Sequence, residues 1–141
     1  MKQLKTTLVL TLICIIFMSV CSSCNSQKEE IKRVKDLDCT IVEDADIPEE
    51  LLTIINEKKE APFKLTFTSK GKEYYYIVVG YGTQNTGGYS ISVDDLFLST
   101  NVIYIDTNLI GPSKDEVVTQ VFTYPYIVVK TEFIDKKVVF K

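Results

Sequence analysis

Side chains able to do chemistry are few in this sequence of 141 residues, and histidine is absent from it. Histidine is the commonest general base and the commonest zinc ligand, so its absence disfavours both functions together. Cys39 and Ser90 have no histidine to deprotonate them, which disfavours a nucleophilic role for either residue. Four aspartates of the second half lack the clustered spacing of a calcium loop; they are Asp94, Asp95, Asp106 and Asp115. The sequence therefore predicts a protein that is not an enzyme and holds no metal or other cofactor.

The N-terminal residues have the pattern of an export signal. Lys2 and Lys5 precede an apolar run over residues 8–20. As a helix, these thirteen residues would rise only about 20 Å, which is short of a hydrocarbon core of about 30 Å. A secretory signal peptide fits this basic start and short apolar centre better than a membrane span does.

The residues that follow the apolar run, Val-Cys-Ser-Ser-Cys-Asn-Ser at 20–26, resemble a bacterial lipoprotein lipobox. In a lipobox, small residues precede a cysteine that is lipidated and becomes the N-terminus after cleavage. Cys24 follows two serines and is the predicted lipidation site; Cys21 is the alternative, although Val20 before it is bulky. A signal peptide with incidental cysteines is the other interpretation. Two or three acyl chains would hold the protein stably at a bacterial membrane, where one chain is marginal.

Cleavage before Cys24 would remove residues 1–23 and leave 118 residues. Without the two lysines of the signal, fourteen basic residues stand against nineteen acidic ones, a net charge of −5. Charges of both signs are interspersed and no basic patch is present, which excludes nucleic acid as the expected partner. Cys39 would be the remaining thiol, and one thiol cannot form an intramolecular disulfide. The exported domain must depend on its core, in which Cys39 is predicted to be a small buried residue.

The charged residues 24–36 have little to bury and are predicted to form a flexible tether before a domain at 37–141. Residues 37–42 are the first predicted strand of this domain. Asp46 is then expected to cap a helix that ends before Pro62. The apolar stripe of this helix consists of Ile47, Leu51, Ile54 and Ile55.

From residue 63 onward, short apolar or alternating segments are separated by turn residues, which is typical of β-strands. The predicted strands are residues 63–67, 73–81, 89–98 with a bulge at Asp94 and Asp95, 102–109, 117–124 and 126–131, with a last hairpin around 135–137. Residues 73–81 are apolar on both faces, as a strand covered on both sides would be. No helical pattern lies between these strands. We therefore expect a mainly all-β domain with one short N-terminal helix, either an antiparallel β-sandwich or an open barrel of about seven or eight strands.

A loop over residues 80–89 joins two of these strands and holds four of the six glycines. Gly87 and Gly88 can adopt positive φ, which allows a sharp turn. The loop is either a tight connection shaped by its glycines or a protruding loop that contacts a partner. The Tyr-Pro-Tyr segment at 124–126 is likewise either a strand bulge or a second contact segment. The candidate partner-binding residues are Tyr81, Gln84, Asn85, Thr86, Gly87, Gly88, Tyr89, Tyr124, Pro125 and Tyr126.

Four short motifs in the second half resemble the PrcB C-terminal domain family. They are Tyr-Ile-Val-Val-Gly at 76–80, Thr-Gly-Gly-Tyr-Ser-Ile at 86–91, Val-Thr-Gln at 118–120 and Tyr-Pro-Tyr-Ile-Val-Val-Lys at 124–130. The family takes its name from a lipoprotein subunit of a bacterial surface protease complex. The resemblance implies a non-catalytic, lipid-anchored extracytoplasmic subunit that binds and stabilises a surface or secreted protease.

A second resemblance, to chagasin-like inhibitors of cysteine proteases, gives an alternative function. These inhibitors are β-sandwich proteins that present a Thr-Thr-Gly-Tyr type loop beside an Arg-Pro-Trp type loop. Residues 86–89 and 124–126 would occupy the corresponding places. This chain lacks the Asn-Pro before the threonine, has tyrosines in place of the Arg and the Trp, and has no separate Gly-Gly loop. The alternative is thus inhibition of a protease through residues 86–89.

Overall fold

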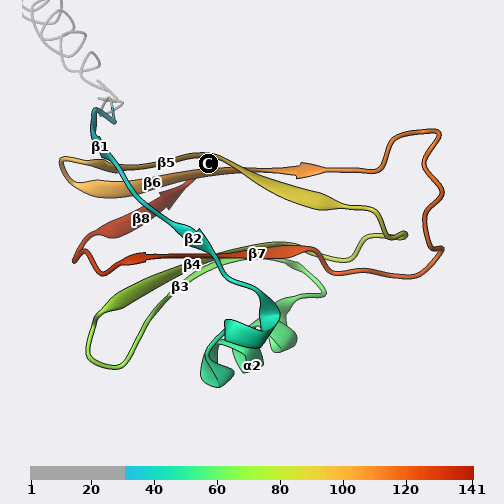
Figure 1. Ribbon diagram of the computed structural model, residues 1–141, viewed down its shortest axis with the longest axis horizontal. Helices are drawn as coiled ribbons and strands as arrows, with labels where there is room; N and C mark the ends of the chain where they lie inside the picture. Colours follow the sequence, from blue (N-terminus) through green and yellow to red (C-terminus); the bar gives the residue numbers. More distant parts are fainter. Residues whose placement is uncertain (1–30) are drawn as a thin grey trace, which may run out of the picture. The chain divides into compact units, whose positions relative to one another are not determined.

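Two four-stranded sheets pack face to face in the computed structural model, which describes residues 31–141 (Figure 1). One sheet has the strand order β1-β5-β6-β8, and the other has the order β2-β7-β4-β3. The strands are β1 (Arg33–Asp36), β2 (Thr40–Ile41), β3 (Pro62–Thr68), β4 (Tyr74–Tyr81), β5 (Ser90–Ser99), β6 (Val102–Ile110), β7 (Tyr126–Glu132) and β8 (Lys137–Phe140). A short 3-10 helix η1 (Asp44–Asp46) and the helix α2 (Glu49–Lys58) separate β2 from β3. The predicted β-sandwich with one short α-helix is confirmed, while the predicted signal peptide, Cys21 and Cys24 lie outside the described residues.

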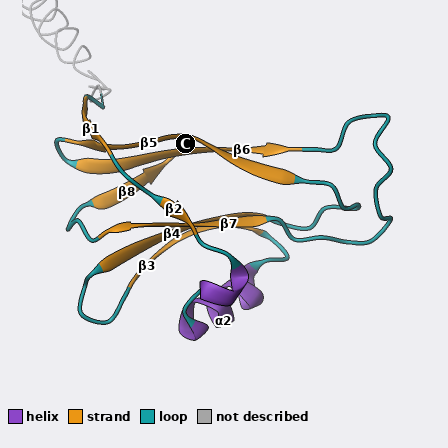
Figure 2. Cartoon of the chain, in the orientation of Figure 1, coloured by secondary structure: helices purple, strands orange, loops and turns teal. Residues whose placement is uncertain are grey.

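β4 is apolar on both faces because each face is covered. Ile77 and Val79 contribute to the core between the sheets. Val78 points the other way, into a second apolar cluster that contains the fully buried Leu51 and Ile55 of α2. Figure 2 shows α2 against the outer face of the sheet that contains β4 and β7. The prediction of a strand covered on both sides is therefore confirmed, as is the burial of the helix stripe at these two positions.

One side of the sandwich is closed by the segment that runs from β1 to β2. β1 pairs with β5 of the first sheet, β2 pairs with β7 of the second, and Leu37 between them is buried in the core. Residues 33–36 were expected in the tether, which is wrong for these four residues. All four side chains of β1 are exposed, so this strand has no apolar periodicity from which it could be predicted. An ion pair between Arg33 and Asp95 connects β1 to β5, and Arg33 also pairs with Asp36 within β1.

Cys39 is exposed, so the prediction that it is a core residue was wrong. The chain crosses from one sheet to the other at this point, and Leu37 takes the core position instead. Partial desolvation, and after it the charge of Asp38, raise the pKa of the Cys39 thiol above its ordinary value of 9.0. The thiolate form of Cys39 is therefore disfavoured.

The start of α2 also differs from the expectation. Asp46 belongs to η1, where its N–H donates to the Glu43 carbonyl at 2.9 Å, and it does not cap α2. Pro48 occupies the N-cap position without a side-chain hydrogen bond, and the helix begins at Glu49. Proline suits this place because its fixed φ and its missing N–H cost nothing there.

Two strand predictions near the end of the chain were wrong. Residues 117–124 form a loop rather than a strand, and only Thr123 makes an isolated β-bridge. β8 does not form a hairpin with β7 but pairs with β6 of the other sheet, in parallel. Both edges of β7 are already occupied, by β2 and β4, so β8 has no place beside it. The predicted turn around residues 135–137 is therefore part of a crossover between the sheets.

Gly80 provides a stability prediction, because a Cβ atom at this position would lie 2.1 Å from Cε1 of Phe63. Gly80 is buried in β4, directly opposite Phe63 in β3, so the ring lies across the bare glycine. We expect Gly80→Ala to lower the free energy of unfolding by about 1–3 kcal/mol, since the ring must leave its place. Urea denaturation measures the loss.

The matched control for Gly80→Ala is the same substitution in a Phe63→Ala background, where no ring is left to displace. The steric explanation requires the cost of Gly80→Ala to fall to near zero there. An equal cost in both backgrounds would contradict it.

Candidate partner-binding surface

The two segments predicted to contact a partner lie side by side at one end of the sandwich. Residues 82–89 connect β4 to β5, and residues 111–125 connect β6 to β7; we call these two segments the paired loops (Figure 1). Gln84 and Thr123 exchange backbone hydrogen bonds of 2.8 and 3.0 Å. The Thr123 hydroxyl also donates to the Thr86 carbonyl at 2.7 Å. The paired loops are therefore joined as one surface.

The glycines of the first loop serve the fit between the loops. The Gly87 N–H donates to the Thr119 carbonyl at 2.9 Å, and a Cβ atom on Gly87 would lie 2.5 Å from the Thr119 hydroxyl. Gly88 has a φ of +83°, and its Cβ would lie 2.7 Å from Cγ1 of Val118. The amide of Gly87 is thus used within the chain. Both glycines allow the two loops to pack closely, because a Cβ atom at either position would collide with the other loop. We therefore expect partner contacts to come mainly from the side chains around them.

Three of the four candidate tyrosines direct their polar or charged contacts into the domain. The hydroxyls of Tyr81 and Thr107 are hydrogen-bonded at 2.8 Å, which links the two sheets. The Tyr126 hydroxyl donates to Asp44 Oδ1 at 2.7 Å. The Tyr124 ring lies 5.4 Å from Lys59 Nζ, a cation–π contact at the end of α2. These residues position the paired loops more than they extend their outer surface.

The outer surface is formed by apolar side chains that were not among the predicted site residues. Val117 is 99% exposed and Phe122 is 68% exposed, and both project from residues 111–125. Val121 and Ile110 are also exposed large apolar residues, in the same loop and at the end of β6. The signal for them was present in the sequence, as the apolar residues of 117–124, but it was interpreted as a strand. Exposed apolar side chains that gather on one loop are typical of a protein contact surface.

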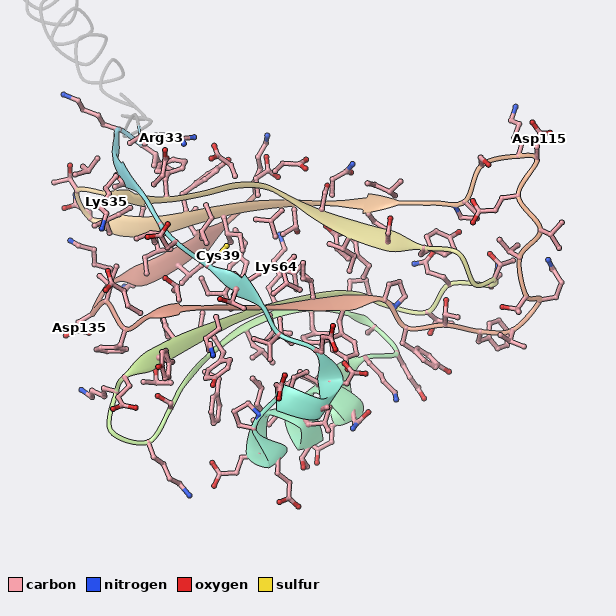
Figure 3. All side chains as sticks on the ribbon, in the orientation of Figure 1. Arg33, Lys35, Cys39, Lys64, Asp115 and Asp135 are labelled. Carbon is pink, nitrogen blue, oxygen red and sulfur yellow. The ribbon has the colours of Figure 1, made fainter. Side chains whose placement is uncertain are left out.

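Charged residues directly precede the exposed apolar side chains in residues 111–125. Asp115 lies at the tip of residues 111–125, away from the sheets (Figure 3). Glu116 is held in a local turn, where its carboxylate accepts from the Ser113 N–H at 3.2 Å and its own N–H donates to the Ser113 carbonyl at 3.1 Å. Lys114 lies beside them with the opposite charge. A loop that carries exposed apolar side chains together with charges of both signs suits a protein partner.

Tyr126 makes the free energy of unfolding depend on pH in the alkaline range. Burial, then the hydrogen bond from Tyr126 to Asp44 and the Asp44 charge, raise the pKa of this tyrosine above its ordinary value of 10.0. Above pH 10 the unfolded chain releases this proton before the folded protein does, so the stabilising contribution of Tyr126, complete below pH 10, falls as pH rises. Tyr126→Phe lacks this proton and the hydrogen bond, and should be less stable by about 1 kcal/mol at neutral pH.

The measurement is urea unfolding of the wild type and Tyr126→Phe on both sides of pH 10. The gap between the two proteins should narrow as the pH rises. A gap that stays constant through this range would contradict the role given to the Tyr126–Asp44 hydrogen bond.

Comparison with known proteins gives a match to one family. Residues 75–132 match the model of the PrcB C-terminal family. No match was found among curated proteins or among solved structures. The matched segment runs from β4 to the end of β7 and includes both paired loops. The match supports the resemblance of residues 75–132 to the PrcB C-terminal family that the sequence motifs predicted.

Proposed function

We propose that this chain is a lipid-anchored extracytoplasmic subunit that binds a surface or secreted protease through the paired loops and stabilises it. The observation that carries the proposal is the exposed apolar side chains of Val117 and Phe122 within the family-matched segment. In water these side chains are costly to expose, and a partner that buries them gains free energy in proportion to the area covered.

The chemistry of the paired loops supports binding rather than catalysis. Residues 82–89 and 111–125 contain neither histidine nor cysteine. The Thr123 hydroxyl is engaged in a hydrogen bond to the Thr86 carbonyl, which joins the loops. A surface of this kind offers area and shape to a partner but no activated nucleophile.

The course of the chain supports an anchor on the N-terminal side. Arg33 in β1 pairs with Ser99, at the end of β5 that is opposite to Ser90 and the paired loops (Figure 1). A lipid on Cys24 or Cys21 would then leave the paired loops free to meet a partner away from the membrane. Within residues 31–141 no helix has the length and apolarity needed to span a membrane.

Protease inhibition is the second candidate function. The observation that favours it is that the two motifs compared with chagasin-like inhibitors lie close together. Thr123, directly before the second motif, donates its hydroxyl to the Thr86 carbonyl in the first and forms a β-bridge with Gln84. Against it, the Gly87 amide and the Tyr126 hydroxyl are already engaged within the chain. An inhibitor loop needs such groups free for the cleft of the protease.

The two functions differ in their effect on protease activity. The purified protein is incubated in turn with the surface and secreted proteases of the source cell, and the activity of each protease is followed over time. A longer half-life of activity supports the stabilising subunit. A stoichiometric loss of activity supports the inhibitor, and no effect on any protease would contradict both.

A further inference from the structure

The β3 edge of the second sheet is open. β3 pairs with β4 on one side, and within residues 31–141 no strand pairs with its other side. The opposite edge of the same sheet ends in β2, which belongs to the segment that closes that side of the sandwich. An unpaired edge strand presents backbone donors and acceptors that another extended chain can use.

The hydrogen-bond register shows which backbone groups of β3 are free. The Ser69 N–H donates to the Tyr74 carbonyl at 3.0 Å, which fixes this pair as a hydrogen-bonded one. Hydrogen-bonded and non-hydrogen-bonded pairs alternate along an antiparallel ladder. The pairs that contain Phe63, Leu65 and Phe67 are therefore bonded to β4. The N–H and C=O groups that point away from β4 are those of Lys64, Thr66 and Thr68.

A pocket of about 470 Å³ lies beside this edge. Its lining consists of Pro62, Phe63, Lys64, Val79, Gly80, Tyr81, Thr107 and Lys141. Phe63, Leu65 and Phe67 pack toward α2, so the alternate residues of β3 face the space between the sheets. Every second side chain of a strand added to β3 would face the same way as Lys64, and the one beside Lys64 would lie at this pocket.

The charge of the edge indicates the kind of segment that fits it. Residues 62–72 contain three lysines and no acidic residue. Lys64 lies at the space between the two sheets (Figure 3), where its Nζ donates to the main-chain oxygen of Lys141 at 2.8 Å and pairs with no aspartate or glutamate side chain in residues 31–141. A second copy of this edge would bring lysines against lysines, which disfavours self-pairing. An acidic segment would complement them.

We propose that β3 accepts an extended acidic segment of a protein partner as an additional strand, with the acidic side chains of that segment on the face of Lys64 and its apolar side chains on the face of Phe63, Leu65 and Phe67. The backbone groups of Lys64, Thr66 and Thr68 form the ladder, and Lys64 sets the preference for acidic residues. The exposed apolar side chains of the paired loops take no part, so this surface does not depend on the proposed function.

The probe for this proposal is a seven-residue peptide of alternating glutamate and valine, with a lysine–valine peptide of the same length as its control. Amide hydrogen exchange and peptide affinity are measured on the full folded protein. The glutamate peptide should protect the amides of Lys64, Thr66 and Thr68. Lys64→Glu should weaken its binding by at least about tenfold. Lys35→Glu, in β1 of the other sheet, should leave the affinity for the peptide unchanged.

Thr66→Pro removes one outward N–H without removing a hydrogen bond to β4, and edge positions of this kind accept proline. Thr66→Pro should also lower the affinity for the glutamate peptide by about tenfold, because one hydrogen bond between the peptide and β3 is lost. Absence of peptide binding would overturn the proposal, as would protection at other strands or equal binding of the lysine peptide. A concentration-dependent dimer that protects the same amides without peptide would also overturn it, since a second copy would then be the occupant.

Discussion

The Cys24→Ala variant is expected to carry no fatty acid and to lose its stable attachment to the membrane. Each buried methylene of an acyl chain contributes about 0.8 kcal/mol to membrane binding, so two or three chains outweigh any contact the domain could make at the surface. The apolar run at residues 8–20 does not replace them, because it is short of a membrane span. Labelling of cells with a fatty-acid analogue, followed by membrane sedimentation, measures both effects.

The Cys21→Ala variant is the control for this experiment, because it removes a neighbouring thiol and leaves the predicted lipidation site in place. It should incorporate the label and sediment with membranes as the wild type does. If Cys21→Ala alone abolishes labelling, the anchor stands and its site is Cys21. If the wild type takes up no label and neither variant is released from membranes, the proposal of a lipoprotein fails.

The strands that could be predicted from the sequence are those whose pattern of apolar and polar side chains matches the burial of their faces. β4 has apolar residues on both faces because the inter-sheet core and α2 cover it, and this composition is visible without a structure. The bulge in β5 was likewise predictable, since Asp94 and Asp95 interrupt its alternation and the register shifts there. Local chemistry was sufficient in both cases.

The elements that could not be predicted are those whose position depends on partners distant in the chain. β1 is a strand because β5 offers it an edge, although none of its own side chains is buried. β8 joins β6 because β2 and β4 already occupy both sides of β7. Residues 117–124 have the composition of a strand but find only one bridge, at Thr123. The periodicity of a segment indicates which of its faces is buried, but it does not indicate which other strand has an unpaired edge beside which the segment can lie.

The candidate surface was predictable to a similar extent. The resemblance to chagasin-like inhibitors indicated that residues 86–89 and 124–126 lie near each other, and in the structure Thr123 joins the second segment to Gln84 and Thr86. It gave no indication that Gly87 would be held by Thr119, or that Tyr126 would bond to Asp44, because both partners are distant in the chain. The exposure of Phe122 followed only once its segment was found to lack a partner strand.

Phe122→Ser should weaken binding of the protease partner by about a hundredfold, a loss of about 3 kcal/mol. Phe122 is 68% exposed in the isolated chain, so a partner that covers the paired loops buries most of a phenylalanine ring, the type of side chain that dominates interfaces. The same exposure means that the folded domain depends little on it. Its free energy of unfolding should change by less than about 0.5 kcal/mol. Titration calorimetry and urea denaturation measure the two quantities.

Ile41→Ser provides the matched control for Phe122→Ser, because Ile41 is a large apolar residue with a similar exposure of 60% but belongs to β2 rather than to the paired loops. It should leave the affinity unchanged. Equal losses from both variants would show that general surface apolarity, and not the paired loops, attracts the partner. The same pair separates the two candidate functions: Phe122→Ser should shorten the lifetime of a protease that the wild type stabilises, whereas it should restore the activity of one that the wild type inhibits. A variant that binds as tightly as the wild type would remove the paired loops from either function.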